Sequence, residues 1–109
     1  VNGATGGVGL AAVQVARALN CRQIIATGRG SEKLAVVARH GATCCLNLEE
    51  EVSLATALKA QTNGRGVDVV FDTIGGEVFD ESLRGTAWGA RVLVVGFASG
   101  KHPSIRANY

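Results

Sequence analysis

The sequence contains one proline, two histidines and no apolar run long enough to cross a bilayer. A membrane-spanning helix needs about 18 or more consecutive apolar residues. The formal net charge is only +2, from 11 basic and 9 acidic side chains, which is too small to indicate nucleic acid or an anionic membrane surface as a partner. We therefore expect neither a membrane nor a nucleic acid to be bound.

Cysteine is also scarce, and its pattern is uninformative for metal binding or disulfides. The three cysteines are Cys21, Cys44 and Cys45, with no CxxC motif and no paired histidines. An odd number of cysteines, two of them adjacent, does not indicate a secreted disulfide framework. We expect no metal site in this chain and an intracellular location, cytoplasmic or mitochondrial.

The remaining composition suits one domain over residues 1–109, with 47% hydrophobic residues. Short runs rich in valine and isoleucine alternate with segments of helical spacing. This alternation predicts an α/β fold with a doubly wound, mostly parallel sheet in three layers, α-β-α. The expected strands, after one at the N-terminus, are residues 23–27, 43–46, 67–72 and 91–95. In the last two, "VDVVFD" and "RVLVV", the apolar residues are consecutive and do not alternate with polar ones, which predicts strands covered on both faces.

Helices are expected between these strands. Ser31 is predicted to cap a helix that runs to about residue 40, and Ser53 to cap another. A fourth helix is expected over residues 77–87. In the first helix, the spacing of Val8, Val15 and Leu19 with two alanines between them predicts the face that packs on the core.

A glycine-rich stretch, "GATGGVG", stands where the first strand should end and the first helix begin. This position is the one that the dinucleotide-binding fingerprint of the Rossmann fold requires. Gly6 would let the backbone approach a pyrophosphate, and Gly9 would let the helix pack closely on the strand. The N–H groups near Gly7 and Val8 would face the anion at the positive end of the helix. Ala4 replaces the usual first glycine, and a tight turn without a ligand remains an alternative.

The end of the second strand bears on the choice of nicotinamide cofactor. Enzymes that prefer NAD have a carboxylate there to hold the ribose hydroxyls. Here the strand ends at Thr27 without one, and Arg29, Ser31 and Lys33 follow. Two cations and a hydroxyl can bind a 2′-phosphate through charge-assisted hydrogen bonds, so the sequence favours NADP(H). The alternative is that Arg29 and Lys33 are solvated surface charges.

Four stretches together resemble the cofactor domain of the medium-chain dehydrogenase/reductase superfamily. They are "NGATGGVGLAAVQVA", "ATGRGSEK", "GVDVVFDTIGG" and "ARVLVVGFASG". The branch they resemble is the zinc-free quinone oxidoreductases related to zeta-crystallin. The resemblance implies an enzyme that transfers hydride from NADPH to a small molecule, a quinone or an α,β-unsaturated carbonyl. It also implies a homodimer and a larger two-domain subunit, of which this chain would be a fragment truncated at both ends.

The resemblance also assigns roles to residues by position. Gly6, Gly7, Val8 and Gly9 would hold the pyrophosphate, and Ser31 and Lys33 would contact the 2′-phosphate. Thr73 would lie along the adenosine, and the nicotinamide would be bordered by Gly96, Phe97 and Ala98. Two departures weaken the match. Asn47–Leu48 stands where relatives often have Asn-Tyr with the tyrosine on the 2′-phosphate, and Phe97 stands where many have asparagine.

No catalytic residue is identified within the chain, and Asp72 is better explained by capping a turn than by a ligand, although it stands at the sheet edge where such sheets bind ligands. The absence of a Y-x-x-x-K motif disfavours a short-chain dehydrogenase. Two alternatives remain open. One is the cofactor domain of a zinc-dependent alcohol dehydrogenase, and the other is a non-catalytic, crystallin-like nucleotide-binding module.

Overall fold

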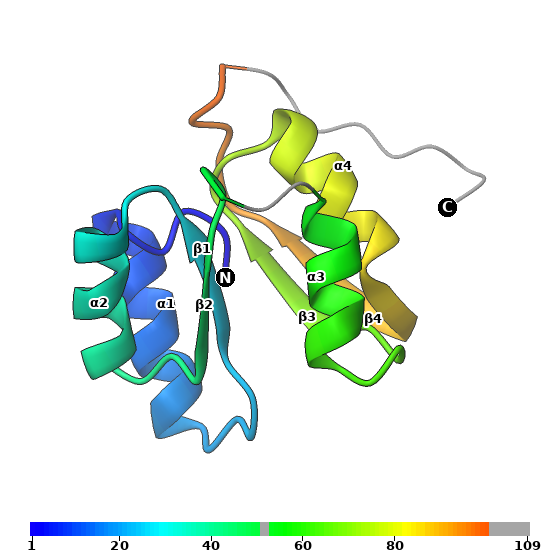
Figure 1. Cartoon of the computed structure of the whole chain (residues 1–109), viewed down its shortest axis with the longest axis horizontal. Helices are drawn as coiled ribbons and strands as arrows, with labels where there is room; N and C mark the ends of the chain where they lie inside the picture. The colour runs from blue at the N-terminus through cyan, green and yellow to red at the C-terminus, as the bar shows by residue number, and fades with distance from the viewer. Residues whose placement is uncertain (51–52, 101–109) are drawn as a thin grey trace. The chain divides into compact units, whose positions relative to one another are not determined.

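The computed structural model describes residues 1–50 and 53–100, in two compact units. The N-terminal unit is Val1–Glu51 and the C-terminal unit is Val52–Tyr109. His102, Pro103 and Tyr109 lie outside the described residues. The helices and strands, labelled in Figure 1, are α1 (Gly7–Ala18), β1 (Ile25–Gly28), α2 (Ser31–Arg39), β2 (Cys44–Asn47), α3 (Leu54–Gln61), β3 (Val67–Asp72), α4 (Gly76–Arg84) and β4 (Thr86–Val94).

The N-terminal unit is built on a parallel pair of strands. β1 and β2 pair from Ile25 with Cys44 to Gly28 with Asn47. The residues before α1 run along β1 as well, because the Thr27 N–H donates to the Val1 carbonyl at 2.9 Å and its carbonyl accepts from Ala4 at 3.0 Å. These first residues bring the chain to the start of α1 at the end of β1.

The core of this unit lies between α1, α2 and the strands, and both helices lie on one side of β1 and β2 (Figure 1). Its buried residues are Ala4, Val13, Ile24, Ala26 and Val37. The predicted core face of α1, which included Ala12 and Ala16, was right only in part, because Ala16 packs against this core. Val8, Val15 and Leu19 are 58%, 57% and 72% exposed, whereas Gly9 and Val13 are buried. An alanine-rich helix is apolar around most of its circumference, so its spacing does not single out one face.

The C-terminal unit is built on β3 and β4, which are also parallel. β3 has the predicted bounds, but β4 begins at Thr86 and α4 ends at Arg84, so both predicted boundaries between them were wrong. Gly85 caps α4, and its carbonyl accepts from Val67 at 2.9 Å, so strand pairing begins directly after the helix. A Cβ at position 85 would lie 2.7 Å from the Leu58 side chain, so a glycine there lets α3 pack against the end of α4.

The two strands of the C-terminal unit are not covered on both faces by the described residues, contrary to the prediction. Val69 of β3 is 54% exposed, and Leu93 and Val94 of β4 are 48% and 53% exposed. By contrast, all four residues of β1 are buried. Consecutive apolar residues in the sequence therefore did not distinguish a strand buried on both faces from a strand buried on one face.

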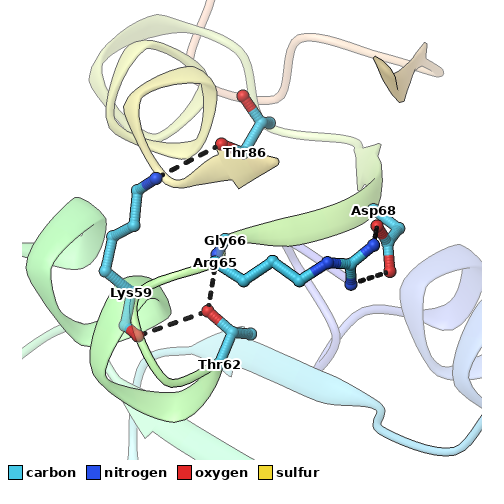
Figure 2. A network of polar contacts seen from close by, with 6 residues as sticks. All are labelled: Lys59, Thr62, Arg65, Gly66, Asp68 and Thr86. Carbon is cyan, nitrogen blue, oxygen red and sulfur yellow. Dashed lines mark hydrogen bonds and ion pairs between the residues drawn. The ribbon is translucent and has the colours of Figure 1, made fainter. Parts of the chain in front are cut away.

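Polar contacts fix the turn from α3 to β3, as Figure 2 shows. The Thr62 hydroxyl accepts from the Gly66 N–H at 2.8 Å, and Lys59 donates to the Thr86 carbonyl at 3.5 Å. Arg65 and Asp68 form a two-pronged ion pair, at 2.9 and 2.6 Å. The hydrogen bond to Asp68, and then its charge, raise the pKa of Arg65. The first and third contacts fix the turn and the start of β3, and the contact of Lys59 joins α3 to the start of β4.

The two predicted serine caps had different outcomes. Ser53 is the N-cap of α3, and its hydroxyl accepts from the Thr56 N–H at 3.2 Å, which confirms that prediction. Ser31 is not a cap, because Gly30 is the N-cap of α2 and no side chain caps that helix. Gly30 has φ +95°, a conformation that a non-glycine residue rarely adopts, and this turn starts α2 one residue earlier than the sequence indicated.

We predict that Ser53→Ala lowers the free energy of unfolding by about 1 kcal/mol, because an N-cap hydrogen bond of α3 is lost. Ser31→Ala is the matched control, since Ser31 caps nothing, and it should change stability by less than about 0.5 kcal/mol. Urea unfolding of both variants measures the difference. Equal losses in the two variants would contradict the assignment of Ser53 as the cap.

Candidate functional site

The glycine-rich turn forms the N-terminus of α1. Gly6 is the N-cap, with φ −84° and ψ 169°, and its carbonyl accepts the first helical hydrogen bond from Leu10 at 2.9 Å. Within the described part of the chain, the N–H groups of Gly7, Val8 and Gly9 have no protein acceptor. Open N–H groups at the positive end of a helix favour an anion.

The glycines of this turn differ in how much space surrounds each of them. A Cβ on Gly9 would lie 2.7 Å from the Gly3 carbonyl carbon and 2.8 Å from the Ala4 Cα, so α1 can approach the first residues only because Gly9 has no side chain. Gly6 and Gly7 have room. A Cβ on Gly6 would have an ordinary contact at 3.5 Å, one on Gly7 would have no neighbour within 4 Å, and neither residue has a positive φ. The fold therefore requires Gly9 but not Gly6 or Gly7.

The end of β1 lies against this turn. A Cβ on Gly28 would lie 2.8 Å from the Thr5 methyl group, so a glycine at 28 lets the turn pack over the strand end. Thr27 is 1% exposed, and its hydroxyl donates to the Asn2 side chain at 2.7 Å. The Thr27 side chain thus ties β1 to the first residues, beneath the turn.

After β1 the chain borders an open hollow of about 540 Å³. Its lining residues are Gly30, Ser31, Glu32, Lys33, Asn47, Glu49 and Glu50. The Asn47 side-chain oxygen accepts from the N–H groups of Gly30 at 3.4 Å and of Glu49 at 3.1 Å. Asn47 therefore joins the two turns that border the hollow. Ser31 and Lys33 are exposed and both line it, and Arg29 is exposed just before it in the chain.

The other predicted site residues lie together in the C-terminal unit. The Thr73 carbonyl accepts from the Ala98 N–H at 3.0 Å, and a Cβ on Gly96 would lie 3.3 Å from the same oxygen. The loops that follow β3 and β4 are thus side by side, with Phe97 46% exposed between them. Asp72 is fully buried, and its carboxylate accepts from the Gly75 N–H at 2.8 Å, so its role as a turn cap is confirmed.

Other titratable groups offer little for chemistry. Burial, and then the neighbouring Cys44, raise the pKa of the Cys45 thiol, which donates to the Leu34 carbonyl at 3.5 Å. A raised pKa means less thiolate at neutral pH, which disfavours a nucleophilic role. Among residues 1–50 and 53–100 no three His, Cys, Asp or Glu side chains are placed to hold a metal ion. No helix in the same ranges has the length and apolar character of a membrane span.

Sequence reasoning missed Thr5, Glu49 and Glu50 as residues of the site. For Glu49 and Glu50 the signal was present only in the register of the parallel strands, and Thr5 was found only from the contact of its methyl group with the end of β1. Because Gly28 pairs with Asn47, the turn that follows β2 must lie beside the turn that follows β1. The same register explains the position of Leu48, which stands where relatives often have a tyrosine. Its N–H extends the pairing of the two strands by donating to the Gly28 carbonyl at 2.8 Å.

Parallel strands, connecting helices and a glycine turn with open amides are the elements of a Rossmann-type nucleotide-binding domain. The model of the zinc-binding dehydrogenase family matches residues 7–109, and the chain belongs to that family. The resemblance to the quinone oxidoreductase branch of the medium-chain dehydrogenase/reductase superfamily is confirmed by its relatives.

Three relatives illustrate the match. The chain is 38% identical to quinone oxidoreductase-like protein 2 of Rattus norvegicus, over 99% of this chain and 31% of the relative. It is 37% identical to prostaglandin reductase-3 of Bos taurus, over 92% of this chain and 26% of the relative. The crystal structure of Escherichia coli quinone oxidoreductase complexed with NADPH superposes with a TM-score of 0.86 at 32% identity, covering 98% of this chain and 32% of that one.

The chain thus spans about a third of the length of the relatives it matches. The α/β class and the Rossmann-type cofactor domain predicted from sequence are confirmed by these comparisons. The presence of helices on both sides of the sheet, as in the predicted α-β-α arrangement, and the roles assigned to individual residues remain predictions.

We predict that Gly9→Ala lowers the free energy of unfolding by about 1–3 kcal/mol, because the added methyl group would overlap the backbone at Gly3 and Ala4. The matched variant Gly7→Ala adds the same group in open space at the first turn of the same helix. It should leave stability unchanged or raise it by up to about 1 kcal/mol. Denaturant unfolding of both variants tests this, and equal destabilisation would contradict the distinction between the two glycines.

Proposed function

We propose that the chain binds NADP(H) and serves as the cofactor domain of an enzyme that transfers hydride to a small molecule, a quinone or an α,β-unsaturated carbonyl. The observation that carries the proposal is the glycine turn. At Gly6 and Gly7 a side chain would fit without a clash, yet both positions are glycine. The N–H groups of the first turn of α1 have no acceptor among the described residues. A pyrophosphate would occupy that space and accept those hydrogen bonds.

Each group of residues would hold one part of the nucleotide. The N–H groups of Gly7, Val8 and Gly9 would bind the pyrophosphate, with Gly6 giving it access. In the N-terminal unit, Arg29, Ser31 and Lys33 would bind the 2′-phosphate beside the end of β1. Thr27 would act from beneath, by holding the strand end in place.

In the C-terminal unit, Thr73 would lie along the adenosine side of the cofactor, and Gly96, Phe97 and Ala98 would border the nicotinamide. A glycine at 96 lets the two loops approach closely, since a side chain there would lie only 3.3 Å from the Thr73 carbonyl oxygen. Bound NADPH would supply the hydride, and these residues would orient its ring and shield it from water. No catalytic residue is assigned to this chain.

The relatives support the nucleotide and the class of reaction. One solved relative is described as a quinone oxidoreductase complexed with NADPH, and two others are named quinone oxidoreductase-like protein 2 and prostaglandin reductase-3. The same proposal includes a small-molecule substrate and no metal. It also includes a homodimer of larger two-domain subunits and an intracellular location.

The 2′-phosphate assignment is tested by fluorescence titration of the intact protein with NADPH and NADH. We expect tighter binding of NADPH. Lys33→Ala should weaken NADPH binding about tenfold and leave NADH binding unchanged, because only NADPH has the 2′-phosphate. Arg39→Ala is the control, since it removes a charge from the other end of α2. Equal losses for both nucleotides in Lys33→Ala would refute the assignment.

The pyrophosphate assignment is tested by Gly6→Ala. The added methyl group makes only an ordinary contact within the protein. Because Gly6 is the N-cap of α1, where alanine is less favourable than glycine, the free energy of unfolding should fall by no more than about 1 kcal/mol. The methyl group would stand between the backbone and the pyrophosphate, so NADPH and NADH should both bind at least tenfold more weakly. Calorimetry measures both affinities, and unfolding measures stability. Unchanged binding of both nucleotides would favour the alternative of a turn without a ligand.

A further inference from the structure

The hollow beside the end of β1 carries more negative than positive charge. Its lining contains one ammonium group, on Lys33, and three carboxylates, on Glu32, Glu49 and Glu50. No ion pair joins any of these four side chains to another described residue. The three carboxylates are therefore not neutralised by the lysine, and their charges act on whatever enters the hollow.

The carboxylates have different structural settings. Glu32 lies in the first turn of α2, where a negative charge stabilises the helix. Glu49 and Glu50 follow β2 and lie in no helix. Their backbone is held in place, because Glu49 donates to the Asn47 side chain at 3.1 Å and Glu50 to the Asn47 carbonyl at 3.0 Å. The fold thus keeps two exposed carboxylates at the edge of the hollow with no stabilising role evident among the described residues.

We propose that Glu49 and Glu50 determine cofactor specificity by opposing the 2′-phosphate, so that they limit the preference for NADPH over NADH. The inference rests on the proposed function, since it places the 2′-phosphate between Lys33 and these carboxylates. A dianionic phosphate is attracted by Lys33 and Arg29 and repelled by Glu49 and Glu50. NADH has no phosphate there and does not experience the repulsion.

The experiment compares the double variant Glu49→Gln/Glu50→Gln with the parent in the intact protein. Glutamine keeps the size and polarity of each side chain and removes its charge. Dissociation constants for NADPH and NADH are measured by fluorescence titration at ionic strengths of about 0.02 M and 0.5 M, because screening distinguishes a charge effect from a contact. Glu81→Gln, which removes a carboxylate from α4 in the C-terminal unit, is the control.

We expect NADPH to bind about tenfold more tightly to the double variant at low ionic strength, with a smaller gain at high ionic strength and no change for NADH. Glu81→Gln should leave both constants unchanged. The probes 2′,5′-ADP and 5′-AMP, which differ by the 2′-phosphate, should reproduce the gain for the first alone.

Three results would overturn the proposal. Unchanged NADPH binding would show that the carboxylates do not face the phosphate. Weaker NADH binding would show that they bind the ribose instead. If the parent protein binds neither nucleotide, the proposed function fails and this inference fails with it, whereas the first two results leave nucleotide binding intact and overturn only the role of Glu49 and Glu50.

Discussion

The approach of α1 to the first residues of the chain is the contact on which the site depends. Gly9 lies so close to Gly3 and Ala4 that no side chain fits between them. Ala4 is in turn hydrogen-bonded to Thr27 at the end of β1. The helix therefore begins at the carboxyl end of the strand, and its open N–H groups are presented at that edge, where parallel sheets bind ligands.

The glycines near the site fall into two groups, according to whether an added Cβ would collide with another part of the chain. Gly9 and Gly28 are explained by neighbours within the chain, because each would collide with an adjacent segment. No neighbouring segment explains Gly6 or Gly7, since a methyl group would fit at both, although Gly6 is also the N-cap of α1, where glycine is preferred to alanine. Within a helix glycine lowers stability relative to alanine, so Gly7, which has free space around it, indicates a requirement outside the protein. A bound anion at the helix N-terminus is such a requirement.

The sequence predicted what depends on local pattern. The bounds of β3 and the cap at Ser53 were right, because strand propensity and capping act over a few residues. The core face of α1 was right only in part, since alanines blur its apolar side. The end of α4 at Gly85 depends on the approach of Leu58 from another helix, and the hollow depends on the pairing of β1 with β2. Neither feature could be predicted from the sequence, because each depends on contacts between segments that are distant along the chain.

The hollow also changes how the two cations near β1 should be interpreted. From the sequence, Arg29 and Lys33 alone favoured a phosphate, because the carboxylates that follow β2 were distant along the chain. Strand pairing places Glu49 and Glu50 at the same hollow as Lys33. Specificity is a difference between two affinities, and it is set by repulsion as well as attraction. If the proposed assignments hold, the choice between NADPH and NADH depends on the charges of both turns together, and it cannot be inferred from the charges of one turn alone.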